Sequence, residues 1–396
     1  MEPPTVQKDV VSYSLADITK YFLKLGALGF GGPVALVGYM HRDLVEQRQW
    51  ISEDEYREGL ALAQLAPGPL AAQLGIYLGY VHYGVWGATL TGLSFVLPSF
   101  IMVVLLGMAY KVYGGLPWMQ SVFYGVGSAV IGIITLSCYK LTLKSVSKIE
   151  PEAIKSRWLL WVFFLAMAIV TAIMQREEVW LFILLGFVYM AVKAPPKWMH
   201  KNGNALSAIL LTGTGFWQFH PGKLMQLGLF FTEAGAFVFG SGLAIIPFLQ
   251  AGVVKQMGWL NEQQFLDSVA VAMITPGPVV ITVGFIGFLV SGFAGAAIAA
   301  LGVFFPCFVF TVLPAPYFKK IAKNASIRAF VDGITAAVVG ALVGSVFVIA
   351  TRSIVDVPSA IIAISTVFAL IYIKKIQEPY IILVAAIVGF CIKTFS

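Results

Sequence analysis

Two Pro-Gly-Pro sequences, at residues 67–69 and 276–278, interrupt long apolar stretches of the chain. Proline lacks a backbone N–H and glycine accepts unusual backbone angles, so each tripeptide is expected to break a helix. The half-helix after such a break begins with unpaired N–H groups and about half a unit of positive charge. Within a bilayer these groups persist only where they line a cavity. The two breaks therefore predict an anion-binding site at membrane depth; the alternative is that they only kink helices for packing.

A glycine-rich segment precedes each break, GALGFGGP at residues 26–33 and GAFVFGSG at residues 235–242. Because glycine has no side chain, a tetrahedral oxyanion could approach the backbone directly at these segments. Side-chain donors beside the breaks would complete its coordination. The predicted substrate-binding residues are Gly29, Gly31, Gly32, Lys24, Gln64, Pro67, Gly68, Pro69, Gly240, Ser241, Gly242, Thr275, Pro276, Gly277 and Pro278.

Four ionisable residues lie within or beside the apolar segments, where an unpaired charge is costly. Lys24 either completes the anion site or extends to the membrane interface. Glu58 and Asp267 occupy equivalent positions before the two breaks. They are candidates for proton coupling, as is Glu233, which matches Lys24 in the other half. For Glu58 and Asp267 the alternative is that they help to cap the start of a helix.

Other polar groups carry weaker signals. His41, Arg42 and Arg48 follow the first glycine-rich segment and form either a basic vestibule or ordinary solvated loop charge. The three cysteines lie in apolar segments at unrelated spacings, so they predict neither a metal site nor a disulfide framework. The four histidines are scattered, and no nucleophile–base arrangement is visible. We expect no cofactor, no metal and no enzymatic activity.

The composition places the chain in a membrane. Hydrophobic residues make up 59% of it and charged residues only 11%. The apolar residues form long runs without strand-like alternation, and about 20 such residues span a bilayer as a helix. The net charge of +7 is concentrated in short loops between these runs, which indicates topology determinants rather than nucleic-acid binding.

The chain matches itself along most of its length. Glycine, proline and tryptophan coincide at an offset of 209 residues, as from Pro67 to Pro276, and later of 208, as from Gly84 to Gly292. Apolar bias alone does not align these residue types together, so the chain is interpreted as a fused duplication. The predicted domains are an N-terminal repeat at residues 1–195, a linker at 196–220 and a C-terminal repeat at 221–396.

The lysine-rich loops occupy opposite positions in the two repeats. They lie at residues 140–157 in the first repeat, but at residues 319–328 and 374–375 in the second. By the positive-inside rule the repeats are therefore inverted, and each crosses the membrane an odd number of times. The predicted fold class is an all-α polytopic membrane protein with two inverted repeats and about ten crossings. In each repeat the glycine-rich segment is re-entrant and the Pro-Gly-Pro helix crosses as two half-helices, 54–66 and 70–82 in the first; an exchange of these two roles remains the alternative.

GFGGP, followed by the acidic segment WISEDEY and then by QLAPGP, resembles the chromate ion transporter family. GSG and TPGP in the second half resemble the C-terminal repeat of that family, and the resemblance covers essentially the whole chain in its long, fused form. It implies a secondary transporter that exports chromate across the inner membrane and confers chromate resistance. The second repeat departs from the first, since Gly242 stands where the first has Pro33, so the two breaks need not share one geometry.

Other transport functions fit the same residues. A sulfate or related oxyanion transporter, working by uptake or exchange, is the alternative because sulfate shares the shape and charge of chromate. A passive anion channel is less favoured, since the polar groups concentrate at two breaks rather than along a pore. The expected partners are a chromate- or sulfate-like oxyanion and membrane lipid, with a homodimer left open and no nucleic acid. The expected location is a bacterial or archaeal plasma (inner) membrane, with multiple passes.

Overall fold

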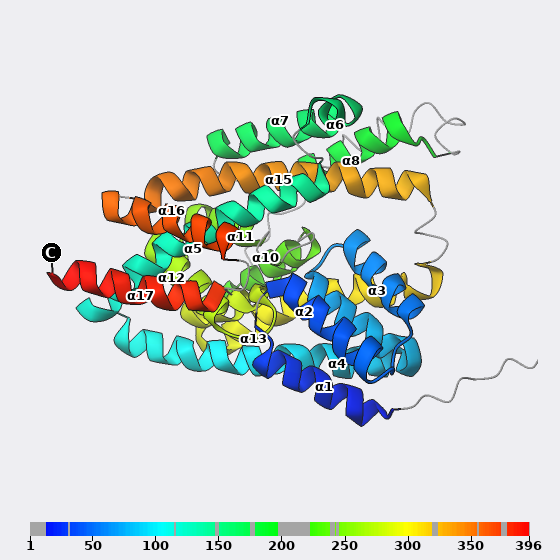
Figure 1. Cartoon of the computed structure of the whole chain (residues 1–396), viewed down its shortest axis with the longest axis horizontal. Helices are drawn as coiled ribbons and strands as arrows, with labels where there is room; N and C mark the ends of the chain where they lie inside the picture. The colour runs from blue at the N-terminus through cyan, green and yellow to red at the C-terminus, as the bar shows by residue number, and fades with distance from the viewer. Residues whose placement is uncertain are drawn as a thin grey trace, which may run out of the picture.

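The computed structural model describes residues 13–30, 32–114, 116–146, 150–174, 179–196, 222–237, 242, 245–318, 324–354, 356–373 and 378–395, and the regular structure of this part is entirely helical (Figure 1). Four of its helices are long and apolar enough to cross a membrane: α4 (Leu70–Tyr113), α5 (Pro117–Ser145), α13 (Thr282–Val312) and α15 (Ala325–Ser353). Shorter apolar helices are α7 (Trp158–Met174), α8 (Val179–Lys193) and α16 (Val357–Tyr372), and α17 (Glu378–Phe395) is the last. The predicted all-α multi-pass membrane class is confirmed.

Helix α4 is two antiparallel helices joined at Gly84, whose φ of 58° suits a glycine turn. The hydroxyl of Thr91 donates to the carbonyl of Gly75 at 3.0 Å. In a straight helix these residues would be about 24 Å apart, so the chain reverses between them. Helix α13 has the same reversal at Gly292, where φ is 64°.

The glycine-rich segment of the first half also reverses the chain. It joins α1 (Leu15–Leu28) to α2 (Gly32–Met40) and η1 (His41–Gln47), a turn of π-helix. The rings of Tyr13 and Trp50 stack at 4.9 Å, and the Tyr21 hydroxyl lies 3.4 Å from Asp43. These contacts hold the two arms antiparallel, with Gly32 at φ 71° in the turn. The predicted reversal at this segment is present.

The Pro-Gly-Pro element of the first half reverses as well, and here the prediction was wrong. Its arms are α3 (Glu53–Leu65) and residues 70–83 of α4. His82 Nε2 lies 3.1 Å from Glu55 Oε1, and Gly59 packs against the ring of Tyr77. Residues early in the first arm thus contact residues late in the second, so the arms run antiparallel and are not two halves of one crossing. Gly68, at φ 140°, permits the tight turn.

This correction changes the expected crossings. After its two hairpins, the first half has residues 85–113 of α4, then α5, α7 and α8 to cross the membrane. The corresponding helices of the second half are residues 293–312 of α13, then α15, α16 and α17. The described helices therefore do not account for five crossings in each half. Most of the predicted linker, residues 197–220, lies outside the described residues.

The two halves interlock through their later helices. Helices α7 and α8 pack on α15, whereas α16 and α17 pack on α5, and Figure 1 shows α15 alongside α7 and α8. A methyl group built at Gly340 would lie 2.1 Å from the Phe164 carbonyl oxygen. One built at Gly132, the repeat counterpart, would lie 2.5 Å from that of Ala363. Close backbone contacts thus recur at corresponding positions of the two halves.

The first half is also held by its own helix caps. Ser14 and Asp17 form a capping box at the start of α1, and Ser52 and Glu55 form one at the start of α3. Each box satisfies backbone N–H groups that the first turn leaves unpaired. Both hairpins of the first half therefore begin at fixed points of the chain. Their tips, at residues 29–32 and 67–69, lie at the opposite ends of the arms.

Candidate functional site

The tip of the first hairpin meets the second Pro-Gly-Pro break. The Gly277 backbone N–H donates to the Gly29 carbonyl oxygen at 2.8 Å, which joins the second Pro-Gly-Pro break to the first glycine-rich turn. A methyl group at Gly277 would lie 2.0 Å from Ser99 Oγ. One at Gly68, the counterpart of Gly277, would lie 3.2 Å from Cys307 Sγ, and Cys307 is the counterpart of Ser99. Each break therefore packs against the long helix of the other half.

A cavity of about 410 Å³ lies at this junction. This volume is in the range of small-molecule sites, about 300–1,000 Å³. Residues from both halves line it: Gly29, Phe30, Gly32, Pro33, Leu70, Ile133, Ser137, Lys140, Leu141, Lys144, Met273, Thr275, Gly277, Val279, Glu378 and Pro379. Leu70 begins α4, and Val279 begins η4 (Val279–Ile281), a turn of 3₁₀ helix that leads into α13, so the helix start after each break reaches the cavity.

The cavity brings together part of the predicted site. Gly29, Gly32, Thr275 and Gly277 line it. Pro69, Pro276 and Pro278 are sequence neighbours of lining residues without lining the cavity themselves, and Pro67 and Gly68 do not line it. Gly242 is buried and faces Val280 next to the second break. Gly31, Gly240 and Ser241 lie outside the described residues.

Lys24 and Gln64 do not line this cavity. Gln64 is exposed on α3. Lys24 lines a separate cavity of about 280 Å³ between α1 and η1, together with Arg42 and Arg48. Among the described residues, Lys24 and Gln64 are therefore not part of the cavity lining that was predicted to bind the anion.

The basic residues after the first hairpin tip are engaged in local contacts. Arg42 Nε lies 2.8 Å from Asp43, and the Arg48 guanidinium lies 4.5 Å from the centre of the Trp50 ring. These contacts favour the interpretation as ordinary loop charge over an open basic vestibule.

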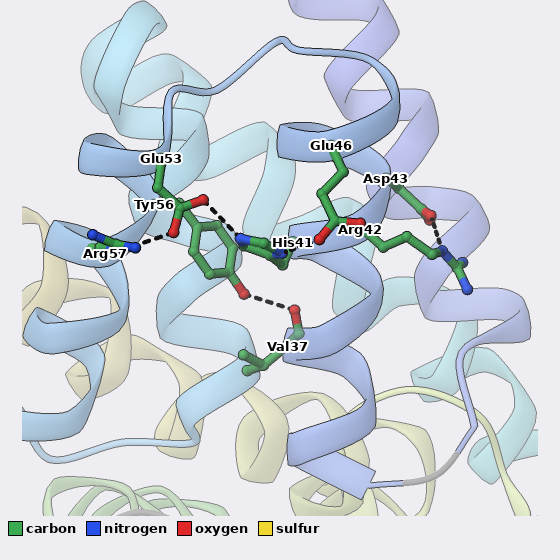
Figure 2. A network of polar contacts seen from close by, with 8 residues as sticks. All are labelled: Val37, His41, Arg42, Asp43, Glu46, Glu53, Tyr56 and Arg57. Carbon is green, nitrogen blue, oxygen red and sulfur yellow. Dashed lines mark hydrogen bonds and ion pairs between the residues drawn. The ribbon is translucent and has the colours of Figure 1, made fainter.

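His41 joins the two hairpins of the first half. Its ring nitrogens lie 3.1 Å from Glu46 and 2.9 Å from Glu53, and Arg57 pairs with Glu53 at 2.8 Å (Figure 2). The hydrogen bond from His41 and the charge of Arg57 lower the pKa of Glu53 from its usual value. The Tyr56 hydroxyl, in the same network, donates to the Val37 carbonyl at 2.6 Å. The network therefore fixes η1 against α3.

The three candidate coupling carboxylates lie in different surroundings. Asp267, on α12 (Glu262–Ile274), is 2% exposed and accepts hydrogen bonds from Tyr110 at 2.5 Å and Gln263 at 2.8 Å. Glu58 is half-buried and hydrogen-bonded to Tyr77. Glu233 is exposed beside a small cavity of about 40 Å³. Asp267 is therefore bonded by a side chain of the other half, Tyr110.

Sequence reasoning missed four polar side chains of the 410 Å³ cavity at the junction, called the main cavity from here on. They are Ser137, Lys140 and Lys144 of α5 and Glu378 at the start of α17. The spacing of the three α5 residues puts them on one helix face, which was a usable signal. The lysines were interpreted only as topology determinants, because nothing local shows that this face of α5 borders the hairpin tips.

Metal chemistry has no visible site in the described ranges. No group of three or more His, Cys, Asp or Glu side chains there is arranged to hold a metal ion. The lining of the main cavity instead combines glycine backbone, helix N-termini, hydroxyl groups and two ammonium groups, which are donors suited to an oxyanion.

The chain matches the family described as chromate transporter over residues 16–191 and 225–390. It is 59% identical over 381 residues to a chromate transport protein of Cupriavidus metallidurans, covering 96% of this chain and 93% of the relative. It is 58% identical to a probable chromate transport protein of Synechococcus elongatus, covering 96% and 95%. A chromate transport protein of Pseudomonas aeruginosa is 29% identical over 94% of this chain and 91% of its own. No solved structure matches the chain.

Proposed function

Since this chain belongs to the chromate transporter family, we propose that it is a secondary transporter that exports chromate from the cytoplasm and thereby confers chromate resistance. The single observation that carries the proposal is the 410 Å³ cavity at the junction of the two halves. Secondary transporters with repeats bind substrate at such a junction, where broken helices point their N-termini at anionic groups.

The charge of the cavity suits a dianion. The half-helices that begin at Leu70 and Val279 contribute about one unit of positive charge between them. Lys140 and Lys144 add two, and Glu378 removes one. The N–H groups at the helix starts and the Ser137 hydroxyl offer hydrogen-bond donors, whereas the Thr275 hydroxyl already donates to the Ala272 carbonyl at 3.0 Å. A desolvated dianion needs compensation of this size.

Export by alternating access requires an inward-facing and an outward-facing state of the protein. We propose that the two halves are inverted repeats related by a pseudo-two-fold axis in the membrane plane, because their lysine-rich loops occupy opposite positions. Inversion requires an odd number of crossings before the second half begins, and so one crossing beyond the four described helices of the first half. Two pairs of corresponding contacts support the repeat relation. Gly68 lies near Cys307 as Gly277 lies near Ser99. Gly132 lies near Ala363 as Gly340 lies near Phe164. The cavity extends from the hairpin tips to Lys144, in the last turn of α5. The lysine-rich loop that follows is cytoplasmic by the positive-inside rule, so this is the inward-facing state.

Transport in inside-out membrane vesicles tests the function directly. Vesicles containing the protein are expected to take up chromate with saturation, and preloaded chromate is expected to accelerate uptake by counterflow. Unlabelled sulfate in the same assay measures the alternative substrate. Saturable uptake of sulfate without uptake of chromate would overturn the proposed substrate, and linear uptake without counterflow would indicate a channel.

Cysteine labelling tests the inverted repeats. In a chain with its native cysteines replaced, single cysteines at positions 144 and 323 are expected to react from the cytoplasmic side. Cysteines at positions 111 and 352 are expected to react from the outside. The measurement is labelling by a membrane-impermeant maleimide in intact cells and in inside-out vesicles. Labelling of positions 111 and 323 from the same side would contradict the inverted arrangement.

A further inference from the structure

One face of α5 carries polar groups along the wall of the main cavity. Ser137, Lys140 and Lys144 all line it, at spacings of three and four residues. Residues so spaced lie one above the other on a helix. Ile133, one turn before Ser137, lines the cavity too, so the row leads from the last turn of α5 toward its buried middle. Gly29 and Gly277 line the same cavity.

The two lysines lack a partner within the described part of the chain. Neither forms an ion pair within 4.0 Å there, whereas Lys255 pairs with Glu262 at 2.5 Å. Like charges four residues apart repel one another on a helix. Two unpaired ammonium groups beside each other at a cavity therefore weaken the protein locally. An anion that binds between them would relieve that cost.

Among the described residues that line the cavity, Glu378 is the one carboxylate. Its Oε1 lies 4.0 Å from the point where a Cβ would be at Gly32, so the carboxylate reaches the hairpin tip. A carboxylate at this place repels an oxyanion and attracts the lysines. It opposes substrate binding unless it is neutralised.

We propose that Lys140 and Lys144 form a capture subsite for a tetrahedral dianion on the inward side of the cavity, with Glu378 as an internal competitor for the same lysines. This subsite rests on the proposed function and names the residues that recognise the charge of the substrate. The cavity is many times larger than the roughly 30 Å³ of one water, so the anion arrives hydrated. The lysines then act through their charge, and the Ser137 hydroxyl and the N–H groups at the start of the two helices donate hydrogen bonds to the anion deeper in the cavity.

The second half lacks an equivalent pair. At the 208-residue offset, Lys140 corresponds to Val348 and Lys144 to Arg352. Val348 is an uncharged residue, 7% exposed. The pair is thus a feature of one side of the transporter, and affinity for the dianion is expected to be higher on that side.

The test is titration of the purified full-length protein in detergent with sodium chromate, by calorimetry, at low and at high ionic strength. A unit charge about 6 Å from a dianion in water changes binding about tenfold. The change Lys140→Ala with Lys144→Ala is therefore expected to weaken binding about a hundredfold at low salt, and much less at high salt because of screening. The pair Lys140→Arg with Lys144→Arg should retain affinity. A matched control, Lys155→Ala with Lys193→Ala, removes two exposed charges outside the cavity and should leave affinity unchanged.

Glu378→Gln is expected to change chromate affinity in the opposite direction to the lysine variants. It removes one negative charge at nearly constant volume, so chromate binding is expected to tighten about tenfold at low salt. This variant keeps the proposal testable if the double alanine variant fails to fold. Wild-type protein that binds neither chromate nor sulfate would overturn the proposed function itself. Normal wild-type binding, with affinity unaltered in Glu378→Gln and in whichever lysine variants fold, would overturn only the capture subsite.

Discussion

Gly277→Ala is expected to abolish chromate binding and to destabilise the fold by about 2–4 kcal/mol. The new methyl group would lie 2.0 Å from Ser99 Oγ and 3.2 Å from the Gly26 carbonyl oxygen. The φ of 91° at this position is one that alanine rarely adopts. The hydrogen bond from Gly277 to Gly29, which closes the junction of the two halves, would lengthen or break. The measurements are thermal unfolding and chromate titration of the purified protein.

Two matched variants separate the causes of that loss. Gly292→Ala has a similar φ of 64° with nothing within 4 Å of the new methyl group, so it carries backbone strain alone. Gly38→Ala has open space and no positive φ, so it should be neutral. Ser99→Gly combined with Gly277→Ala should recover part of the stability by removing the clash. If Gly277→Ala binds chromate as well as Gly292→Ala does, the tip junction is not part of the binding site.

Asp267→Asn is expected to eliminate transport driven by a pH gradient, a loss of about a hundredfold or more, while chromate counterflow continues. Asp267 is buried and accepts a hydrogen bond from Tyr110 of the other half, so a change in its protonation state alters a contact between the two halves. Asparagine keeps the shape and one acceptor but cannot exchange a proton. Uptake into vesicles with and without an imposed pH gradient measures the effect.

Tyr110→Phe and Glu58→Gln are the companions to that experiment. Tyr110→Phe removes the hydroxyl that donates to Asp267 and should shift the pH dependence of uptake without abolishing it. Glu58→Gln changes the counterpart carboxylate, whose surroundings are less buried, and should have the smaller effect. Full stimulation by a pH gradient in Asp267→Asn would exclude this residue as the coupling group.

The membrane class, the glycine-rich turn and the identity of the breaks were predictable because each is a local property. Long apolar runs predict helices because backbone N–H and C=O groups in lipid must bond to each other within the segment. The positive φ angles of Gly68 and Gly277 can be predicted from the residue type, since other residues adopt such angles only at a cost in free energy. Gly29, Gly32, Thr275 and Gly277, four of the predicted site residues, line the main cavity. Residues that interrupt a helix leave backbone groups that can face a ligand.

The direction of the chain after a break was not a local property. Pro-Gly-Pro permits either a kink or a reversal, and contacts between distant residues, such as Glu55 with His82, decide between them. The same holds for Lys140 and Lys144, which by sequence are merely basic residues at a helix end. They border the cavity because α5 packs beside the first hairpin tip and the second Pro-Gly-Pro break. The sequence by itself determined where the helices break and which backbone groups are free; the tertiary structure alone decided which side chains meet them, because packing joins residues that no spacing relates.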